Sequence, residues 1–319
     1  MTKTICIFDT SIASLNQGDE IIMDAINCNL RDLFPNHMVT RTLTHDRIGH
    51  PTYRMISDAD YLFVGGTNLL SSNMNKYRQW KVSLWDLLQG LQGVVLMGVG
   101  WWQYQGDVNT YTKLLLKGLL SPWMFHSVRD SYTENRLRQA GFSNVLNTGC
   151  PTIWNLDEEH CKAIPKDKAP NVLFTLTDYK QARENDKRFV EILIANSTRA
   201  YFWPQGRNDE HYVRELGFDN SITYLAPRLS AFDELLADPS MSVDYVGTRL
   251  HAGIRAMQHK RRSIVVAVDN RATEMGRDFN ICVVPRGEES TLLELINQPF
   301  ETHIQLPTES INRWKSQFQ

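Results

Sequence analysis

The chain alternates short apolar runs with longer amphipathic segments, and this alternation limits its fold more than any other feature. Several of the apolar runs are continuous, which is typical of parallel strands that helices cover on both faces. In the first half the predicted strands are 4–9, 38–43, 61–65, 94–99, 124–128 and 145–148. The predicted helices between them are 19–33, 76–89, 109–120 and 131–140. This order indicates repeated βαβ units.

A polar, charged stretch at residues 157–170, DEEHCKAIPKDKAP, interrupts the alternation and predicts a linker. The pattern then restarts, with strands predicted at 172–177, 200–203, 222–225, 242–246, 263–268 and 281–284. The predicted helices of this half are 186–196, 209–216, 229–237, 250–259, 271–279 and 290–297. We therefore expect an α/β protein with two doubly wound, Rossmann-like domains, 1–156 and 171–319, which face each other across a cleft.

Composition excludes several classes of protein. A length of 319 residues fits roughly two domains, and 42% hydrophobic with 22% charged residues is an ordinary globular profile. The formal net charge of −2 provides no broad basic field for nucleic acid. Five cysteines without a C-x-x-C pair predict neither a disulfide framework nor a zinc site. Any anionic ligand must therefore meet a local cluster of cations.

The longest apolar runs fall well short of the roughly 20 residues that a membrane-spanning helix needs. The N-terminal sequence MTKTICIFDT is unlike a secretory signal. We therefore expect a cytoplasmic protein without a transmembrane segment, for which peripheral contact with a membrane remains open.

Ligands of doubly wound sheets bind beyond the carboxyl ends of the strands, so the loops at these ends are the candidate sites. The loop after the first strand contains Asn16 and Asp19 but lacks G-x-G-x-x-G. The absence of these glycines weakens the interpretation that the loop binds a nicotinamide dinucleotide. Asp19 is either a helix N-cap or a carboxylate that orients or deprotonates a sugar hydroxyl.

Two further loops of the first half carry polar or flexible residues. Gly65, Gly66 and Asn68 directly follow the third strand, where glycines allow backbone N–H groups to approach an oxygen-rich ligand, although a tight turn also explains them. Arg129 and Asp130 follow the fifth strand, either as ligand contacts or as a local ion pair.

The sharpest pattern of the second half is VGTRLHAG at residues 246–253, a strand, a glycine turn and a helix start. Arg249 and His251 fall within the first turn, where free N–H groups and the helix dipole favour an anion. Arginine adds a planar fork of donors, and histidine adds a proton that is mobile near neutral pH. Arg271 and Arg207 follow neighbouring strands, and we expect them to converge with Arg249 on a dianion, although each could also be a solvated surface charge.

Together these loops resemble the polysaccharide pyruvyl transferase family, in family order across residues 9–275. The matching elements are Asn16-Gln17-Gly18-Asp19, Gly65-Gly66 followed by Asn68-Leu69, Ser127-Val128-Arg129-Asp130, Gly149-Cys150-Pro151, Gly247-Thr248-Arg249-Leu250-His251-Ala252 and Asp269-Asn270-Arg271. The Arg-Leu-His element is the most specific of them. The sequence departs from the family at Thr67, where a third glycine is common, and at Cys150, where an aspartate is common.

The resemblance implies a fold similar to that of the GT-B glycosyltransferases, with phosphoenolpyruvate bound against the second domain. Members place a pyruvate ketal on a sugar of a capsule, cell-wall or exopolysaccharide unit, and the acceptor is a saccharide or a lipid-linked saccharide. We expect no metal ion and no cofactor beyond phosphoenolpyruvate as co-substrate. A phosphate and a carboxylate on one small molecule require convergent cations.

Roles for single residues follow from this chemistry. His251 is the candidate general acid, or the group that neutralises the departing phosphate, and Asp19 is the candidate for the acceptor hydroxyl. The expected donor-binding residues are Arg249, His251, Arg271, Arg207, Gly247 and Thr248. The expected acceptor-binding residues are Asn16, Asp19, Gly65, Gly66, Asn68 and Arg129. Because Arg249 and His251 are expected outside the core, alanine variants of both should abolish transfer and still fold.

Two alternatives remain. One is a GT-B glycosyltransferase that uses a nucleotide sugar, for which Glu274 is the available candidate to recognise the ribose or base. The other is a non-catalytic sugar-binding or regulatory protein, which Thr67 and Cys150 keep open. Aromatic residues near the loops of the first domain could stack on a sugar ring or pack in the core, and they are Trp80, Trp85, Trp101, Trp102 and Tyr104.

Overall fold

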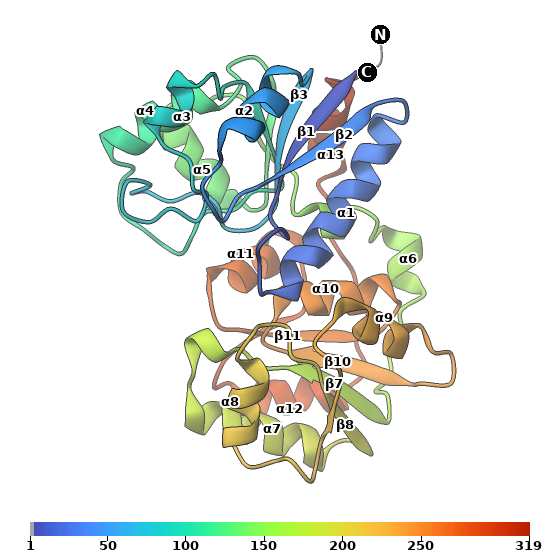
Figure 1. Cartoon of the computed structure of the whole chain (residues 1–319). Helices are drawn as coiled ribbons and strands as arrows, with labels where there is room; N and C mark the ends of the chain where they lie inside the picture. The colour runs from blue at the N-terminus through green and yellow to red at the C-terminus, as the bar shows by residue number, and fades with distance from the viewer. Residues whose placement is uncertain (1–2) are drawn as a thin grey trace. The chain divides into compact units, whose positions relative to one another are not determined.

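The computed structural model describes residues 3–319, and internal contacts divide the chain into two units. Unit 1 comprises the described part of Met1–Ser14 together with Ile22–Trp154 and Leu306–Gln319. Unit 2 comprises Leu15–Ile21 and Asn155–Gln305. Each unit is an α/β domain built on parallel strands, as the alternation of the sequence predicted (Figure 1).

Unit 1 contains a four-stranded parallel sheet in the order β2-β1-β3-β4. Its strands are β1 (Thr4–Asp9), β2 (Met38–Leu43), β3 (Tyr61–Gly65) and β4 (Val94–Met97). A parallel bridge between Val99 and Val128 continues the sheet toward the pair β5 (His126–Val128) and β6 (Val145–Asn147). Helix α1 (Gln17–Leu33) begins in unit 2 and continues into unit 1 from Ile22 onward. The other helices of unit 1 are α2 (His50–Ser57), α3 (Leu84–Leu88), α4 (Thr110–Leu119), α5 (Ser131–Gln139), the short η1 (Pro151–Ile153) and α13 (Thr308–Ser316).

Unit 2 contains a six-stranded parallel sheet in the order β12-β11-β10-β7-β8-β9. Its strands are β7 (Asn171–Thr175), β8 (Arg199–Phe202), β9 (Thr223–Tyr224), β10 (Val243–Gly247), β11 (Ser263–Ala267) and β12 (Val283–Pro285). Its helices are α6 (Glu158–Lys162), η2 (Asp178–Lys180), α7 (Arg183–Ala195), α8 (Asp209–Glu215), α9 (Leu229–Ala237), α10 (Leu250–Gln258), α11 (Asn270–Phe279) and α12 (Glu289–Asn297). This is the strand order of dinucleotide-binding folds, and the direction of winding reverses between β7 and β10.

The predicted helix 76–89 is wrong over most of its length, because only Leu84–Leu88 is helical. The preceding segment is held by other parts of unit 1 instead. The backbone N–H of Lys81 donates to the carbonyl of Thr44, and the fully buried Trp80 ring packs edge-on against Phe8. Burial of one large aromatic side chain therefore outweighs helix propensity here. The predicted linker 157–170 also contains the short helix α6, whose N-cap is Asp157.

The C-terminal segment Leu306–Gln319 belongs to unit 1, which corrects the expected boundary of 171–319. Its helix α13 carries Trp314, which is fully buried, and Phe318 follows the helix. Both rings contact Phe63 of β3, with ring centroids 6.1 and 5.3 Å away. The apolar surface that these contacts bury explains the placement. No helix within residues 3–319 combines the length and the apolar character needed to cross a membrane.

His126 of β5 predicts a specific pH dependence of stability. Its ring is fully buried, accepts a hydrogen bond from the N–H of Leu96 and donates one to the carbonyl of Ser121. Burial lowers the pKa of His126 to about 4, although the Ser121 hydrogen bond opposes the effect. Between about pH 6.5 and 4, His126 is protonated in the unfolded chain but neutral in the folded chain. The free energy of unfolding therefore falls as the pH falls through that range.

The expected size of this loss is about 3 kcal/mol, because each pH unit between the two pKa values is worth about 1.4 kcal/mol. Denaturant unfolding of unit 1 at pH 7, 5.5 and 4 measures it. His126→Gln, which does not titrate, should be less stable at pH 7 but should lose about 3 kcal/mol less on acidification. An equal loss in the wild type and the variant would contradict the assignment.

Candidate functional site

The candidate site of unit 2 lies at the carboxyl ends of β7 and β10, where the winding of the sheet reverses and ligands of such folds bind. Gly247 ends β10, and a Cβ atom there would lie 2.4 Å from Oγ1 of Thr175, so this turn needs glycine. Oγ1 of Thr248 donates to Oγ1 of Thr177 at 3.0 Å, and Oγ1 of Thr175 accepts from the N–H of Arg249 at 3.2 Å. These contacts fix the start of α10 against the end of β7.

Arg249 is the N-cap residue of α10, and its guanidinium group is buried rather than exposed. Its Nε donates to Oδ2 of Asp209 at 3.2 Å, its Nη2 donates to Oδ1 of the same carboxylate, and Asp178 lies 3.6 Å from Nη2. Burial raises the pKa of the fully buried Asp209 carboxyl, and Arg249 opposes that shift. The expectation that Arg249 and His251 lie outside the core is wrong, because both side chains are buried. Arg249→Ala would also leave a buried carboxylate without its partner, so we expect that variant to be destabilised.

Arg271 lies in the first turn of α11, at the end of the strand next to β10. Its Nε donates to Oδ2 of Asp269 at 2.9 Å, and its Nη2 donates to the hydroxyl of Tyr179. The Tyr179 ring centroid lies 4.9 Å from Cζ of Arg249 and 5.8 Å from Cζ of Arg271. The structure thus brings the two arginines together around one tyrosine that the sequence did not single out.

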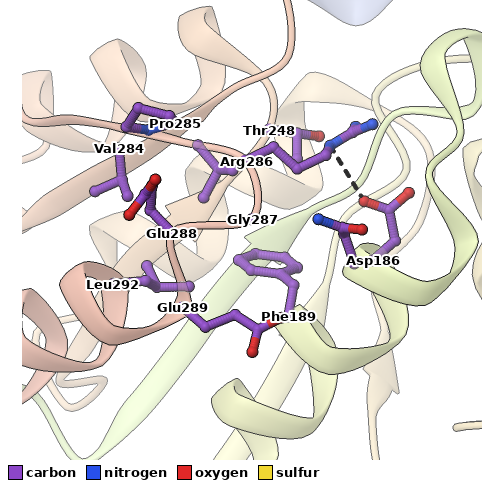
Figure 2. A pocket seen from close by; sticks show the side chains of 12 residues that line it. Asp186, Phe189, Thr248, Val284, Pro285, Arg286, Gly287, Glu288, Glu289 and Leu292 are labelled. Atoms are coloured by element: carbon purple, nitrogen blue, oxygen red, sulfur yellow. Dashed lines mark ion pairs between the residues drawn. The ribbon is translucent and has the colours of Figure 1, made fainter.

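Figure 2 shows a pocket of unit 2 whose lining includes Arg286, a residue that contacts the turn with Tyr179. The pocket holds about 330 Å³ of atom-free space, partly open to solvent, and Thr248 and Arg286 contribute to its wall. Nη1 of Arg286 donates to the carbonyl of Lys180, and Nε of Arg286 lies 3.4 Å from Oδ1 of the buried Asp186. Arg286 therefore helps to position η2 and the Tyr179 ring.

The Asn16–Asp19 segment also belongs to unit 2 through its contacts. Nε2 of Gln205 donates to Oδ1 of Asn16 at 2.8 Å, and the N–H of Gly18 donates to the same oxygen at 3.1 Å. A Cβ atom at Gly18 would lie 2.6 Å from Nε2 of Gln205. Asn16 and Gly18 therefore join the start of α1 to the loop after β8, which is a structural reason for the motif.

Asp19 is buried in the first turn of α1. It is one of the charges near Arg271: burial lowers the pKa of that guanidinium, but Asp269, Tyr179 and Asp19 raise it above its usual range. The structure therefore places Asp19 with the predicted donor-binding residues of unit 2. Its predicted role toward an acceptor hydroxyl stays a prediction.

His251 lies in the first turn of α10 and is buried. Asn270, the first residue of α11, is also buried, and both polar atoms of its side chain have no hydrogen-bond partner among residues 3–319. A buried amide without partners is costly, which makes Asn270 a candidate ligand contact. Arg207 is exposed on the loop after β8, and its convergence with Arg249 and Arg271 on a dianion stays a prediction.

Gly65, Gly66 and Asn68 lie at the carboxyl end of β3, next to β1, where the sheet of unit 1 reverses its winding. A Cβ atom at Gly65 would lie 2.4 Å from Cδ1 of Ile26, and one at Gly66 would lie 2.1 Å from Cγ2 of Ile22. Close packing of α1 on β3 thus requires both glycines without any ligand. Asn68 is half-buried, and its Oδ1 has no partner among the described residues.

Thr67, where the family commonly has a third glycine, adopts a left-handed backbone with φ of 47°. A β-branched residue is strained there. We expect Thr67→Gly to stabilise unit 1 by about 1 kcal/mol, because relief of strain exceeds the added entropy of the unfolded chain. Denaturant unfolding measures the change, and Thr223→Gly in the exposed part of β9 is the control expected to destabilise. A Thr67→Gly variant no more stable than the wild type would refute the strain.

Arg129 is fully buried, and its Nη2 lies 3.1 Å from Oδ2 of Asp130. Gly100 makes room for its guanidinium group, since a Cβ atom there would lie 2.4 Å from Cζ. The ion pair expected at the surface is thus an interior pair that supports the start of α5. Cys150, where the family commonly has an aspartate, is buried near Arg129, and burial raises the pKa of its thiol.

The aromatic residues near the loops of unit 1 divide into two groups. Trp80 and Trp101 are fully buried and belong to the core. Trp85 and Tyr104 are exposed, and the half-buried Trp102 stacks on Tyr77 with ring centroids 4.7 Å apart.

Sequence reasoning missed Tyr179 and the partners of the arginines. Asp209 lies two residues after the predicted Arg207, and Asn270 belongs to the quoted Asp269-Asn270-Arg271, so the contacts of both residues could not be inferred from their positions in the sequence. Glu274, the candidate of the nucleotide-sugar alternative, is buried and forms an ion pair with Arg277. Within residues 3–319 no group of three or more His, Cys, Asp and Glu side chains is arranged to hold a metal ion.

Comparison with known proteins gives one family and one fold. The family model for polysaccharide pyruvyl transferase matches residues 16–270. The S. aureus protein MnaA, solved as a co-structure with UDP, has a TM-score of 0.51 at 13% identity, covering 93% of this chain and 89% of that one. A Listeria monocytogenes protein named as a UDP-N-acetylglucosamine 2-epimerase has a TM-score of 0.53 at 10% identity, covering 98% and 90%. No curated protein matches in sequence. The structural matches place the fold in the GT-B class, as expected.

Proposed function

Because this chain belongs to the polysaccharide pyruvyl transferase family, we propose that it moves the enolpyruvyl group of phosphoenolpyruvate onto a saccharide as a ketal and releases phosphate. The observation that carries the proposal is that Arg249 and Arg271 both lie against Tyr179. The two arginines stand at the starts of the neighbouring helices α10 and α11, at the carboxyl end of the sheet. Free backbone N–H groups and two guanidinium groups together suit a molecule with a phosphate and a carboxylate.

Both guanidinium groups already contact carboxylates, which shapes how a donor would bind. Asp209 occupies the Nε and Nη2 side of Arg249. Asp269 occupies the same side of Arg271, where Nη2 also donates to the hydroxyl of Tyr179. A guanidinium group has five N–H donors, so the remaining edges can still bind a ligand. The carboxylates then orient the two guanidinium groups, and both guanidinium groups lie against the Tyr179 ring.

The proposed chemistry balances without a further reactant. A proton added to C3 of phosphoenolpyruvate turns the methylene into a methyl group and makes C2 electrophilic. One sugar hydroxyl attacks C2 and loses its proton, which replaces the proton spent on C3. The C2–O bond to phosphate then breaks, a second hydroxyl attacks C2, and its proton leaves with the phosphate. His251 is the proposed general acid or phosphate partner, because it occupies the first turn of α10 beside Arg249.

Asp19 is the residue proposed to contact the acceptor. Asp19 lies in unit 2 near Arg271, so its carboxylate could bind or deprotonate an acceptor hydroxyl close to the donor. Gly65, Gly66 and Arg129 have structural explanations in unit 1, and their contact with an acceptor remains a proposal. The saccharide belongs to a cell-surface polysaccharide or its lipid-linked precursor.

The test combines ligand-induced stabilisation with detection of product. Thermal unfolding is followed with phosphoenolpyruvate, with inorganic phosphate, with pyruvate and with a UDP-sugar. We expect phosphoenolpyruvate to raise the melting temperature more than phosphate or pyruvate, because a ligand that binds the folded state stabilises it by mass action. Incubation with phosphoenolpyruvate and a panel of lipid-linked and nitrophenyl saccharides should add one pyruvyl group per acceptor and release one phosphate.

Two outcomes would contradict the proposal. Stabilisation by the UDP-sugar alone, with transfer of its sugar, would establish the glycosyltransferase alternative. Stabilisation by saccharides alone, without turnover of phosphoenolpyruvate on any acceptor of the panel, would establish the non-catalytic alternative.

A further inference from the structure

Large apolar side chains are exposed together on one part of unit 1. Leu88 of α3 is 77% exposed, and Trp123, in the turn after α4, is 89% exposed. Trp85 of α3 and Leu114 of α4 are also more than half exposed. Single exposed apolar residues are ordinary, but a group of them that includes two tryptophans marks an interaction surface. We use the name α3–α4 face for the surface formed by Trp85, Leu88, Leu114, Trp123 and the exposed Lys81 and Lys117.

Direct packing of the two helices holds this face together (Figure 1). A Cβ atom at Gly118 of α4 would lie 2.5 Å from Cδ1 of Leu87, so the helices approach closely at that glycine. Leu114 lies one turn before Gly118 on the same side of α4. A parallel bridge joins Leu120 to Val94, which brings the end of α4 next to the segment that leaves α3. Trp123 follows three residues after Leu120.

The short helix α3 is anchored, so its apolar side chains are presented in a defined way. Its acidic residue, Asp86, is buried and accepts hydrogen bonds from the N–H of Ser83 at 2.7 Å and from the hydroxyl of Tyr53 at 2.6 Å. Because the Asp86 side chain is buried, it adds no negative charge to the exposed surface of α3. Trp85 and Leu88 remain on the outside of a rigid turn.

The stretch of chain that contains this face carries mainly positive charges. Residues 76–123 contain five Lys and Arg but only two acidic residues, Asp86 and Asp107, although the whole chain carries a formal charge of −2. Lys81, which leads into α3, and Lys117 of α4 are exposed. Exposed tryptophan and leucine flanked by lysine match the interface of a lipid bilayer with anionic headgroups.

We propose that the α3–α4 face binds the surface of an anionic lipid bilayer. Trp85, Leu88 and Trp123 enter the boundary between headgroups and acyl chains, and Lys81 and Lys117 contact the negatively charged headgroups. The binding is peripheral, and it does not depend on the proposed transfer reaction.

Vesicle flotation of the full chain tests this proposal. Vesicles of phosphatidylcholine with phosphatidylglycerol are compared with vesicles of phosphatidylcholine alone, at low and high salt. We expect the protein to float with the anionic vesicles, to bind the neutral ones at least about tenfold more weakly, and to be released by salt. Absence of flotation with anionic vesicles would overturn the proposal.

Matched variants locate the surface. Trp85→Ser combined with Leu88→Ser, and separately Trp123→Ser, should weaken vesicle binding by about tenfold or more, because each removes apolar surface that the bilayer would bury. The control is Leu293→Ser on α12 of unit 2, a residue that is also exposed. Lys81→Glu with Lys117→Glu tests the charge, against Lys187→Glu on the exposed side of α7. Circular dichroism establishes that every variant folds.

Two results would speak against a bilayer. Binding that the patch variants leave unchanged would place the contact elsewhere. A wild-type dimer that dissociates in the Trp85→Ser, Leu88→Ser variant, without vesicle binding by either protein, would show instead that the face joins two copies of the chain.

Discussion

Arg249→Ala is expected to abolish transfer and also to destabilise unit 2 by about 3–5 kcal/mol. The loss of activity follows from the position of Arg249 at the N-terminus of α10, facing Tyr179. The loss of stability follows from Asp209, which is buried and would keep its carboxylate without a counterion. Loss of activity in this variant alone therefore cannot separate a binding role from a structural one.

The double variant Arg249→Gln with Asp209→Asn separates them, because it removes both charges and leaves two amides that can hydrogen-bond each other. We expect the double variant to recover most of the stability. Its rate of transfer should remain at least about 100-fold below that of the wild type, because a positioned charge that stabilises the transition state is missing. Denaturant unfolding and the phosphoenolpyruvate assay give the two readouts. Recovery of transfer together with stability would show that Arg249 serves the fold alone.

A second buried ion pair in the same unit supplies the control. Nη1 of Arg262 lies 2.7 Å from Oδ2 of Asp244, and both residues are buried. Asp244 is near the amino end of β10 and Arg262 immediately precedes β11, so the pair lies at the end of the sheet opposite the candidate site. Arg262→Gln with Asp244→Asn should change stability comparably and leave transfer intact.

His251→Asn is expected to lower transfer by roughly 10²–10⁴-fold, which is the usual contribution of a positioned general acid. Stabilisation by phosphoenolpyruvate should change only a few-fold, because Arg249, Arg271 and the helix N-termini remain. Turnover and thermal shift measured on the same preparation distinguish this result from a loss of binding.

His160→Asn is the matched control for this prediction. Nε2 of His160 hydrogen-bonds the carbonyl of Met257 at 2.8 Å, at the far end of the helix whose first turn contains His251. A histidine that only supports α10 should be replaceable without loss of turnover. Near wild-type transfer in His251→Asn would remove His251 from the chemistry.

Most of the strands were predictable because they bury residues in continuous runs, a signal that does not depend on the rest of the fold. β1, β2 and β3 begin and end at the predicted residues. The prediction of a helix at 76–89 was wrong because Trp80 is buried in a non-helical segment and the helix begins only after its N-cap, Ser83. The glycines Gly65 and Gly66 were recognised as special, but the reason lies in helix packing from Ile22 and Ile26.

The sequence by itself determined two wound α/β units and the placement of Arg249 and His251 at a helix start, because periodicity and turn residues act over short stretches of chain. Only the tertiary structure decided that Asp209 pairs with Arg249, that Tyr179 joins Arg249 to Arg271, and that Leu306–Gln319 packs in unit 1. These contacts join segments that are far apart in the chain. They depend on the order of strands in the sheet and on which buried surfaces fit each other, which no local pattern records.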